Sequence, residues 1–289
     1  MDKYKNILVL SGGGIKGIGH IGCFKALEDM GILQHFDTFA GSSAGALVIG
    51  LLVVGYSPDE LYQFLLKFNI EKATNVSIEN FSKYNGFDTG TKMEYVIKRL
   101  ISAKGLEPDI TLLEIYKKTG KMVVLTTVCW NTAELIYLTH KNYPNMPLYL
   151  AIRMSISVPI YYTPVKFNGK IYLDGACMDN YPIKYFEHEL DKVVGIYLSD
   201  NYKENNNYNF TISSDSEHEN LESYITRLIQ IFFKANSYHN KKGFEKYTVD
   251  VELDYINIVE FSLPYEKKQK IFQAGYDAII KNRDKFLVL

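Results

Sequence analysis

The sequence predicts an α/β fold in which a central sheet carries helices on both faces. Apolar runs of strand length, such as 7–10 and 193–198, alternate with longer segments whose apolar residues recur at helical spacing. Two strand-to-helix junctions, at 12–17 and 41–45, are rich in glycine. The alternation predicts the fold class, and the two junctions are where we expect the chemistry.

The length predicts one domain over residues 1–289, because such a chain can bury a sizeable core and no repeat or linker divides it. The informative motifs lie within 6–200. Asn, Ser and acidic residues dominate at about 201–220, which predicts a mobile loop. A helix–strand–helix is expected over 221–289.

The composition excludes several classes of function. With 32 basic and 33 acidic residues, the formal net charge of -1 gives no field to recruit nucleic acid, so any membrane contact would be local and apolar. The three cysteines (Cys23, Cys129, Cys177) form no CxxC pair, which favours a reducing compartment. No signal peptide is expected, and the longest apolar stretch, 46–56, falls short of the ~20 residues that span a bilayer. We therefore expect a cytoplasmic protein, at most peripheral to membranes, and leave its oligomeric state open.

In the N-terminal half, local signals place the elements. Ser57 and Pro58 followed by two acidic residues are typical of a helix start, and Gly120 is typical of a helix end. The mixed polar stretch 69–87 is expected to be a surface excursion. The predicted elements are strands at 7–10 and 36–40 and helices at about 17–30, 46–56, 58–68, 89–103 and 111–118.

In the C-terminal half, Asn168-Gly169 between two short β-rich runs predicts a two-residue hairpin turn, and Asn131-Thr132 predicts another turn. The predicted elements are strands at 123–130, 134–139, 165–167, 171–173, 193–198 and 249–261 and helices at 147–157, 221–235 and 264–286.

The segment 221–235 carries an apolar stripe that includes Leu228 and Phe232. We expect this stripe to pack on the core, because such stripes usually face a sheet. The alternative is an interfacial lid for lipid, which the position after the polar loop suggests.

The pentapeptide 41–45 matches G-x-S-x-G, with Ser43 at the centre of a predicted strand-to-helix turn. Glycines on both sides remove the Cβ atoms that would crowd such a turn. Ser43 is therefore a candidate nucleophile, although small residues also occur where a helix packs tightly on a strand.

The triple glycine, Gly12, Gly13 and Gly14, follows the first strand, so its amides can point into one concavity that holds an anion. The anion would be a phosphate or a transient oxyanion, and Lys16 adds a positive charge beside it. Residues 12–17 also match G-x-G-x-x-G, which leaves a dinucleotide site open. Against it, Asp37 lies at the start of the second strand and not at its end. A Walker A motif is absent.

A serine nucleophile needs a base, and histidine is the usual one. None of the six histidines has a persuasive setting: His20 reads as a packed helix residue, and His188 lies between two glutamates. No HExxH motif or Cys/His cluster predicts zinc.

Taken together, the motifs resemble the patatin-like phospholipases and acyl hydrolases. The similarity rests on four pieces in the same order, over about 6–200: the glycine loop at 12–17, the elbow at 41–45, the small residues before Pro159 at 154–159, and Asp174-Gly175-Ala176. Asn180 and Pro182 also match, whereas Lys16 stands where many members have arginine, and no family motif follows residue 200.

The resemblance implies a mainly parallel sheet in a three-layer α/β/α arrangement and a Ser–Asp dyad. Ser43 would be the nucleophile, Asp174 the general base, and the amides of Gly12, Gly13 and Gly14 the oxyanion hole. Lys16 would orient the substrate, and no metal or cofactor would be needed. The expected activity is hydrolysis of glycerolipid or phospholipid esters. An inactive lipid- or protein-binding module of the same fold is the alternative.

Overall fold

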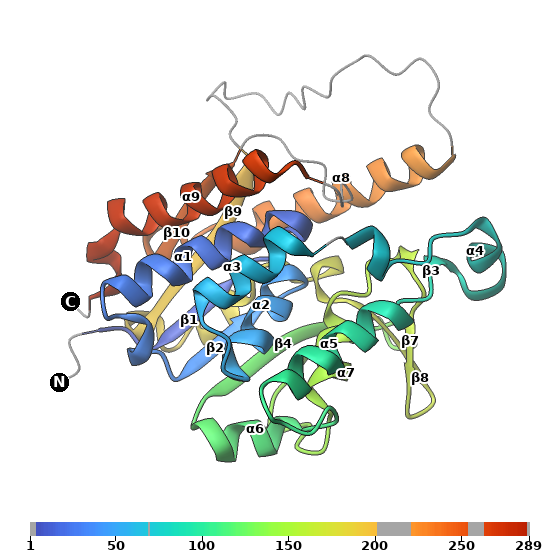
Figure 1. Cartoon of the computed structure of the whole chain (residues 1–289), viewed down its shortest axis with the longest axis horizontal. Coiled ribbons are helices and arrows are strands. Elements are labelled where there is room, and N and C mark those ends of the chain that lie inside the picture. Colours follow the sequence, from blue (N-terminus) through green and yellow to red (C-terminus); the bar gives the residue numbers. More distant parts are fainter. Residues whose placement is uncertain (1–3, 69, 201–220, 254–262, 288–289) are drawn as a thin grey trace.

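The computed structural model describes residues 4–68, 70–200, 221–253 and 263–287 (Figure 1). Its main sheet has the strand order β10-β9-β1-β2-β4-β8-β7, with β5 also paired to β4. The strands of this sheet are β1 (Ile7–Leu10), β2 (Thr38–Gly41), β4 (Met122–Cys129), β5 (Glu134–Leu138), β7 (Val165–Phe167), β8 (Lys170–Asp174), β9 (Val193–Asp200) and β10 (Thr248–Leu253). Neighbours from β10 to β4 run parallel, whereas β5, β8 and β7 pair in antiparallel fashion. The predicted α/β class with a mainly parallel sheet is confirmed.

Nine α-helices lie within the described ranges. They are α1 (Ile18–Asp29), α2 (Ala44–Val53), α3 (Pro58–Lys67), α4 (Ile78–Tyr84), α5 (Thr91–Ala103), α6 (Leu112–Thr119), α7 (Leu148–Ser155), α8 (Leu221–Lys241) and α9 (Tyr265–Lys281). None of these helices combines the length and the apolar character needed to cross a bilayer.

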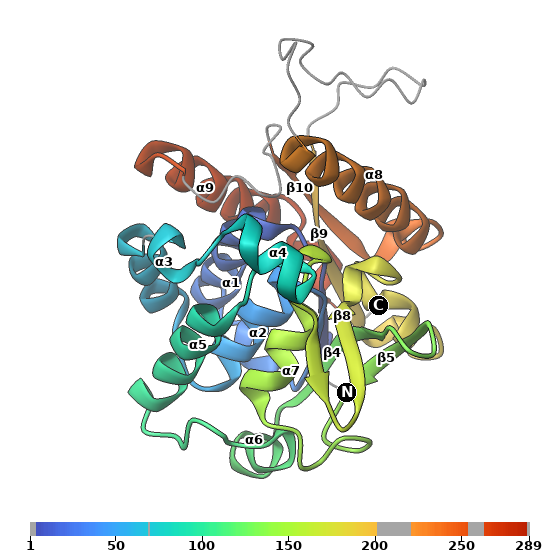
Figure 2. The same ribbon diagram turned by 90° about the vertical axis from the view of Figure 1, so that its right-hand side faces the viewer.

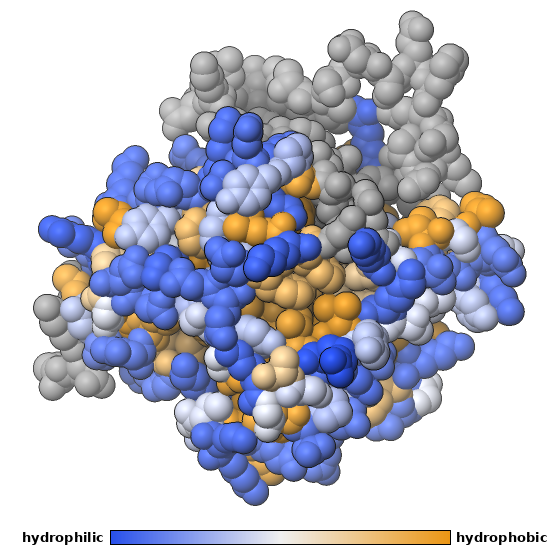
Figure 3. All heavy atoms as spheres, in the orientation of Figure 1, coloured by the Kyte–Doolittle hydropathy of each residue, from blue (hydrophilic) through white to orange (hydrophobic). Residues whose placement is uncertain are grey.

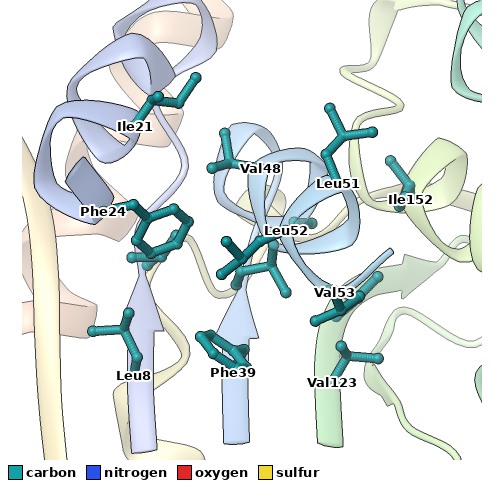
Figure 4. Packing of buried hydrophobic residues seen from close by; sticks show 14 of the residues in the cluster. Leu8, Ile21, Phe24, Phe39, Val48, Leu51, Leu52, Val53, Val123 and Ile152 are labelled. Carbon is teal, nitrogen blue, oxygen red and sulfur yellow. The ribbon is translucent and has the colours of Figure 1, made fainter. Parts of the chain in front are cut away.

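Alternation along the buried strands divides the core into two layers. In β1, Leu8 and Leu10 belong to the larger cluster, whereas Ile7 and Val9 belong to the smaller one. The larger cluster packs α1, α2, α7 and α9 against one face of the sheet, and Figure 4 shows part of it, with Phe24 and Val48 above the strands. The smaller cluster is covered by the chain after β8, and α8 lies on this side (Figure 2).

Glycine residues allow the first and the last α-helix of the described chain to pack against each other. Helix α1 packs closely on α9, because a Cβ on Gly275 would lie 2.0 Å from the carbonyl oxygen of Gly19. The thiol of Cys23 donates a hydrogen bond to the carbonyl oxygen of Gly275 over 3.2 Å. Helix α9 is therefore packed onto the part of the chain that carries the motifs.

Residues 70–87, part of the stretch predicted to be a surface excursion, contain regular secondary structure. They include α4 and the strand β3 (Gly86–Asp88), which pairs in parallel with β6 (Ile160–Tyr162) in a separate two-stranded sheet. Three-residue strands have too few positions to show a period of two, so β3 and β6 were not predicted. The predicted loop at 201–220 and the end of the predicted strand at 249–261 lie outside the described residues.

The expectation that the α8 stripe packs on the core is wrong for its described members. Phe232 is 67% exposed and Leu228 is 38% exposed, whereas Phe233 is buried. The reason is that α8 contacts mainly the chain after β8, through polar side chains such as those of Asn236 and Ser237. Figure 3 shows a mostly polar face on which the broadest group of apolar residues lies between α3 and α5.

Candidate active site

Ser43 occupies the sharp turn between β2 and α2. Its φ of 50° is positive, which costs a non-glycine residue ~1–3 kcal/mol. A Cβ on Gly41 would lie 2.8 Å from the backbone of Gly45, and a Cβ on Gly45 would lie 2.8 Å from the carbonyl oxygen of Ser11. The amide of Ser43 donates to Ser155 Oγ over 3.1 Å. Both glycines are therefore required by the tight turn that carries Ser43.

Asp174 ends β8 and lies beside Ser43, although the two residues are 131 positions apart. Ser43 Oγ donates a hydrogen bond to Asp174 Oδ2 over 2.7 Å. Asp174 Oδ1 accepts from the amide of Ala176 over 2.8 Å, and the Asp174 amide donates to the carbonyl oxygen of Ser157 over 2.9 Å. Pairing with Thr127 of β4 fixes the strand. Each oxygen of the carboxylate thus has a defined partner.

Burial sets the basicity of this carboxylate. Asp174 is fully buried, and the loss of solvation raises its pKa to about 7, against the opposing effect of the hydrogen bonds from Ala176 and Ser43. A carboxylate with a pKa near neutrality is matched to accepting and returning a proton at that pH. The pair can therefore act chemically as nucleophile and base.

The glycine loop lies next to Ser43. A Cβ on Gly12 would be 3.1 Å from Ser43 Cβ. Of the three amides expected to form an oxyanion hole, that of Gly12 already donates to the carbonyl oxygen of Asn180 over 2.9 Å. Gly13 and Gly14 begin the 3-10 turn Gly14–Gly17, and amides at a helix start have no intrahelical acceptor. The geometry therefore favours Gly13 and Gly14 as donors, with Gly12 holding the loop in place.

Asn180 is the contact that connects this loop to α8. Its Nδ2 donates to Ser237 Oγ over 2.5 Å, and its amide donates to Asn240 Oδ1 over 3.0 Å. In the sequence, Asn180 stands out only by its match to the family. Its partners are about 60 residues further along the chain, and no local pattern points to them.

Lys16 lies in the 3-10 turn after the glycines and is only 5% exposed. Its side chain is thus mostly covered, so substrate orientation by Lys16 stays a prediction.

The histidine nearest to the loop has a packing role. His20 is fully buried, and its Nε2 is 2.8 Å from the carbonyl oxygen of Ser11. Because a carbonyl only accepts, Nε2 carries the proton, and burial lowers the His20 pKa to about 4. The hydroxyl of Ser43 donates to Asp174 and not to this imidazole.

The dinucleotide alternative finds no support at Asp37. Its carboxylate accepts hydrogen bonds from Asn6 Nδ2 over 3.0 Å and from Thr38 Oγ1 over 2.8 Å. These contacts lie at the amino end of β2, whereas the glycine loop lies at the carboxyl ends of the strands. A ribose-binding acid would have to lie at the same end as the loop.

Comparison with known proteins gives a consistent picture. A family model described as patatin-like phospholipase matches residues 8–187. Uncharacterized protein R571 of Acanthamoeba polyphaga mimivirus is 29% identical over 281 residues, which cover 94% of this chain and 91% of the relative. Probable lipid hydrolase 463L of Invertebrate iridescent virus 6 is 30% identical over 189 residues, which cover 63% of each chain.

Solved structures share the fold. VipD from Legionella pneumophila superposes with a TM-score of 0.61 at 15% identity, over 99% of this chain and 68% of VipD. ExoU from Pseudomonas aeruginosa, in its complex with SpcU, superposes with a TM-score of 0.54 at 18% identity, over 98% of this chain. The present chain spans 52% of the ExoU chain.

Proposed function

The chain belongs to the patatin-like phospholipase family, and from this premise we propose that it hydrolyses carboxylic ester bonds of glycerolipids, with phospholipids as the first candidates. Ser43 is the proposed nucleophile and Asp174 the proposed base. The observation that carries the proposal is the 2.7 Å hydrogen bond from Ser43 Oγ to the buried carboxylate of Asp174. An inactive binding module would have no need for this strained and buried arrangement.

In the proposed first half-reaction, Ser43 Oγ attacks the ester carbonyl carbon while its proton moves to Asp174 Oδ2. The carbonyl oxygen becomes an oxyanion, which the amides of Gly13 and Gly14 would stabilise. The carbon–oxygen bond to the alcohol then breaks, and Asp174 returns the proton to the leaving alkoxide. The products are a lysolipid or alcohol and an acyl-enzyme on Ser43.

In the second half-reaction, Asp174 takes a proton from water as the water oxygen attacks the acyl-enzyme carbonyl. Collapse of the second oxyanion releases the fatty acid, and the proton returns to Ser43 Oγ. We propose that one domain over 1–289 carries this chemistry. The packing of α1 on α9 supports this proposal, because it joins the C-terminal part to the helix after the glycine loop.

A fluorophosphonate probe tests the nucleophile. We expect covalent labelling at Ser43, because only a hydroxyl activated by a base and facing an oxyanion hole reacts quickly. The neighbouring thiol of Cys177 is free, but burial raises its pKa, so little thiolate is available to compete. Peptide mapping by mass spectrometry gives the site. Labelling that persists in Ser43→Ala, or that maps to Cys177, contradicts the proposal.

The rate of hydrolysis should depend on pH through Asp174. Its folded pKa of about 7 is above the ordinary value of 3.8, so the carboxyl is protonated below that pH and cannot accept the proton of Ser43. We expect kcat/KM for a short-chain ester to fall ~10-fold per pH unit below about pH 7 and to level off above it. A profile that is already flat from pH 5 upward would show that another group is the base.

A further inference from the structure

Helix α8 is attached to the protein by its polar side. Asn236 Nδ2 donates to the carbonyl oxygen of Cys177 over 2.6 Å, and Asn180 bonds to both Ser237 and Asn240. Both Ser237 and Asn180 are buried. The inner face of α8 is therefore largely a row of amide and hydroxyl contacts to the chain that follows Asp174.

The apolar side of α8 faces away from the protein. An α-helix turns by about 100° per residue, so one side of α8, about 100° wide, carries Tyr224, Leu228, Ile231 and Phe232. This side is roughly opposite to Phe233. The exposed fractions of these four residues are 53%, 38%, 43% and 67%, whereas that of Phe233 is 7%. A helix at the surface of a globular protein normally has the reverse orientation, with its apolar stripe on the core. We call these four side chains the outer face of α8.

The charges of α8 suit a lipid surface. Its sequence has the cations Arg227, Lys234 and Lys241 against a single acid, Glu222, although Lys241 forms an ion pair with Asp250 of β10. The chain as a whole has a net charge of -1 and thus no general attraction to anionic lipid, so the positive charge is local to this helix. Tyr238 is 52% exposed, and tyrosine is favoured where an apolar layer meets water. An amphipathic helix with aromatic and aliphatic residues on one side and cations around them is typical of interfacial binding.

The position of the outer face connects it to the site. Met178, four residues after Asp174, is 44% exposed and has its carbonyl oxygen bonded by Asn240 of α8. On the same side of the molecule as the N-terminal part of α8 lies α4, whose Ile78 is 67% exposed (Figure 2). Apolar side chains from three segments, one of which directly follows Asp174, are thus exposed to solvent.

We propose that the outer face of α8 docks the protein onto the surface of a lipid aggregate. The polar inner face of the helix then fixes the orientation of the active site relative to that surface. This inference rests on the proposed function, because it specifies the physical form in which the substrate is met. A second copy of the chain would be a different occupant of the same face, and light scattering without vesicles distinguishes it from lipid.

The test uses the full-length double variant Leu228→Ser/Phe232→Ser, with Tyr95→Ser as the matched control. Tyr95 on α5 is 64% exposed and lies outside α8. Flotation with vesicles of phosphatidylcholine and phosphatidylglycerol is measured in a Ser43→Ala background, so that hydrolysis cannot alter the vesicles. We expect the double variant to bind at least ~10-fold more weakly, because two apolar side chains lose their insertion, and the control to bind as the parent does.

Three outcomes would overturn the inference. One is unchanged flotation of the double variant. Another is a lower melting temperature with parallel loss of binding, which would show that the two side chains support the fold. The third is a change from dimer to monomer in light scattering without vesicles, which would assign the face to a second copy.

The ratio of vesicle-lipid to short-chain ester turnover separates this inference from the proposed function. A fall in this ratio for Leu228→Ser/Phe232→Ser, in the chain that retains Ser43, supports docking. If no ester of either kind is hydrolysed while flotation still depends on the outer face, the proposed function fails and the docking surface stands. If both esters are hydrolysed and the ratio does not change, docking fails and the function stands.

Discussion

Ser43→Ala and Asp174→Asn are each expected to lower kcat/KM for an activated short-chain ester by a factor of at least ~10³. When two residues act as one catalytic unit, an enzyme loses nearly all its activity if either residue is removed. Alanine removes the attacking oxygen. Asparagine keeps the shape of the carboxyl group but cannot accept the proton that Ser43 must lose. Both variants should be assayed as purified, folded protein with the same ester.

The stability of Asp174→Asn gives an independent check that the loss is chemical. Because the folded pKa of about 7 is raised above 3.8, the folded state binds the proton more tightly than the unfolded state does. The cost of the buried carboxylate therefore grows as the pH rises between these values and is fully present above pH 7. The Asn variant should be more stable than the parent at pH 8, by roughly 2–4 kcal/mol in denaturant unfolding.

His20→Gln is the matched test of a histidine base. Glutamine retains a donor for the carbonyl oxygen of Ser11, which His20 Nε2 contacts at 2.8 Å, but it removes the imidazole. We expect this variant to keep most of its activity. A folded His20→Gln protein as inactive as Ser43→Ala would mean that Asp174 is not the base.

The sequence predicted those features of the fold that have local causes. The hairpin turn at Asn168 and Gly169 is an example, with φ of 48° and 73° as a two-residue turn requires. The start of α3 is another, because Ser57 and Glu60 form a capping box. Features that depend on distant partners were not predicted. The strand β3 exists because β6 pairs with it, and neither has a period of its own.

Helix α8 shows why the position of an element is harder to predict than its existence. The 3.6-residue period of its apolar residues predicted a helix at 221–235, and α8 covers that segment. The same period could not say which side faces the protein. The orientation of α8 depends on the hydrogen bonds of three residues, Asn236, Ser237 and Asn240. Their partners lie some 60 positions earlier in the chain.

At the candidate site, the motifs placed the side chains but not their supporting contacts. Ser43 and Asp174 came from two short motifs, and the structure puts them 2.7 Å apart. The hydrogen bond from the Gly12 amide to the carbonyl oxygen of Asn180 could not be predicted, because every residue has a backbone carbonyl. Burial of the Asp174 carboxyl also depends on the assembled fold, and its pKa follows from that burial.

Gly12→Ala is expected to lower kcat for the short-chain ester by roughly 10²–10³, the loss typical of a missing oxyanion donor. A Cβ at this position would lie 2.1 Å from Asn180 Oδ1 and 3.1 Å from Ser43 Cβ. Asn180 has little room to retreat, because its side chain bonds to Ser237 and its amide to Asn240. The loop itself must therefore move, and the donors after Gly12 move with it.

Gly13→Ala is the control, since the atom nearest to its Cβ would be the end of the Leu198 side chain, at 2.9 Å, which can rotate away. We expect less than a ~10-fold loss there, as no backbone donor is displaced. Asn180→Ala combined with Gly12→Ala removes the clashing oxygen, so the double variant should recover part of the kcat lost by Gly12→Ala alone. The test is steady-state kinetics of each variant, with melting curves to show that each variant is folded. Equal losses for Gly12→Ala and Gly13→Ala, or no recovery in the double variant, would show that the contact between Gly12 and Asn180 does not position the loop.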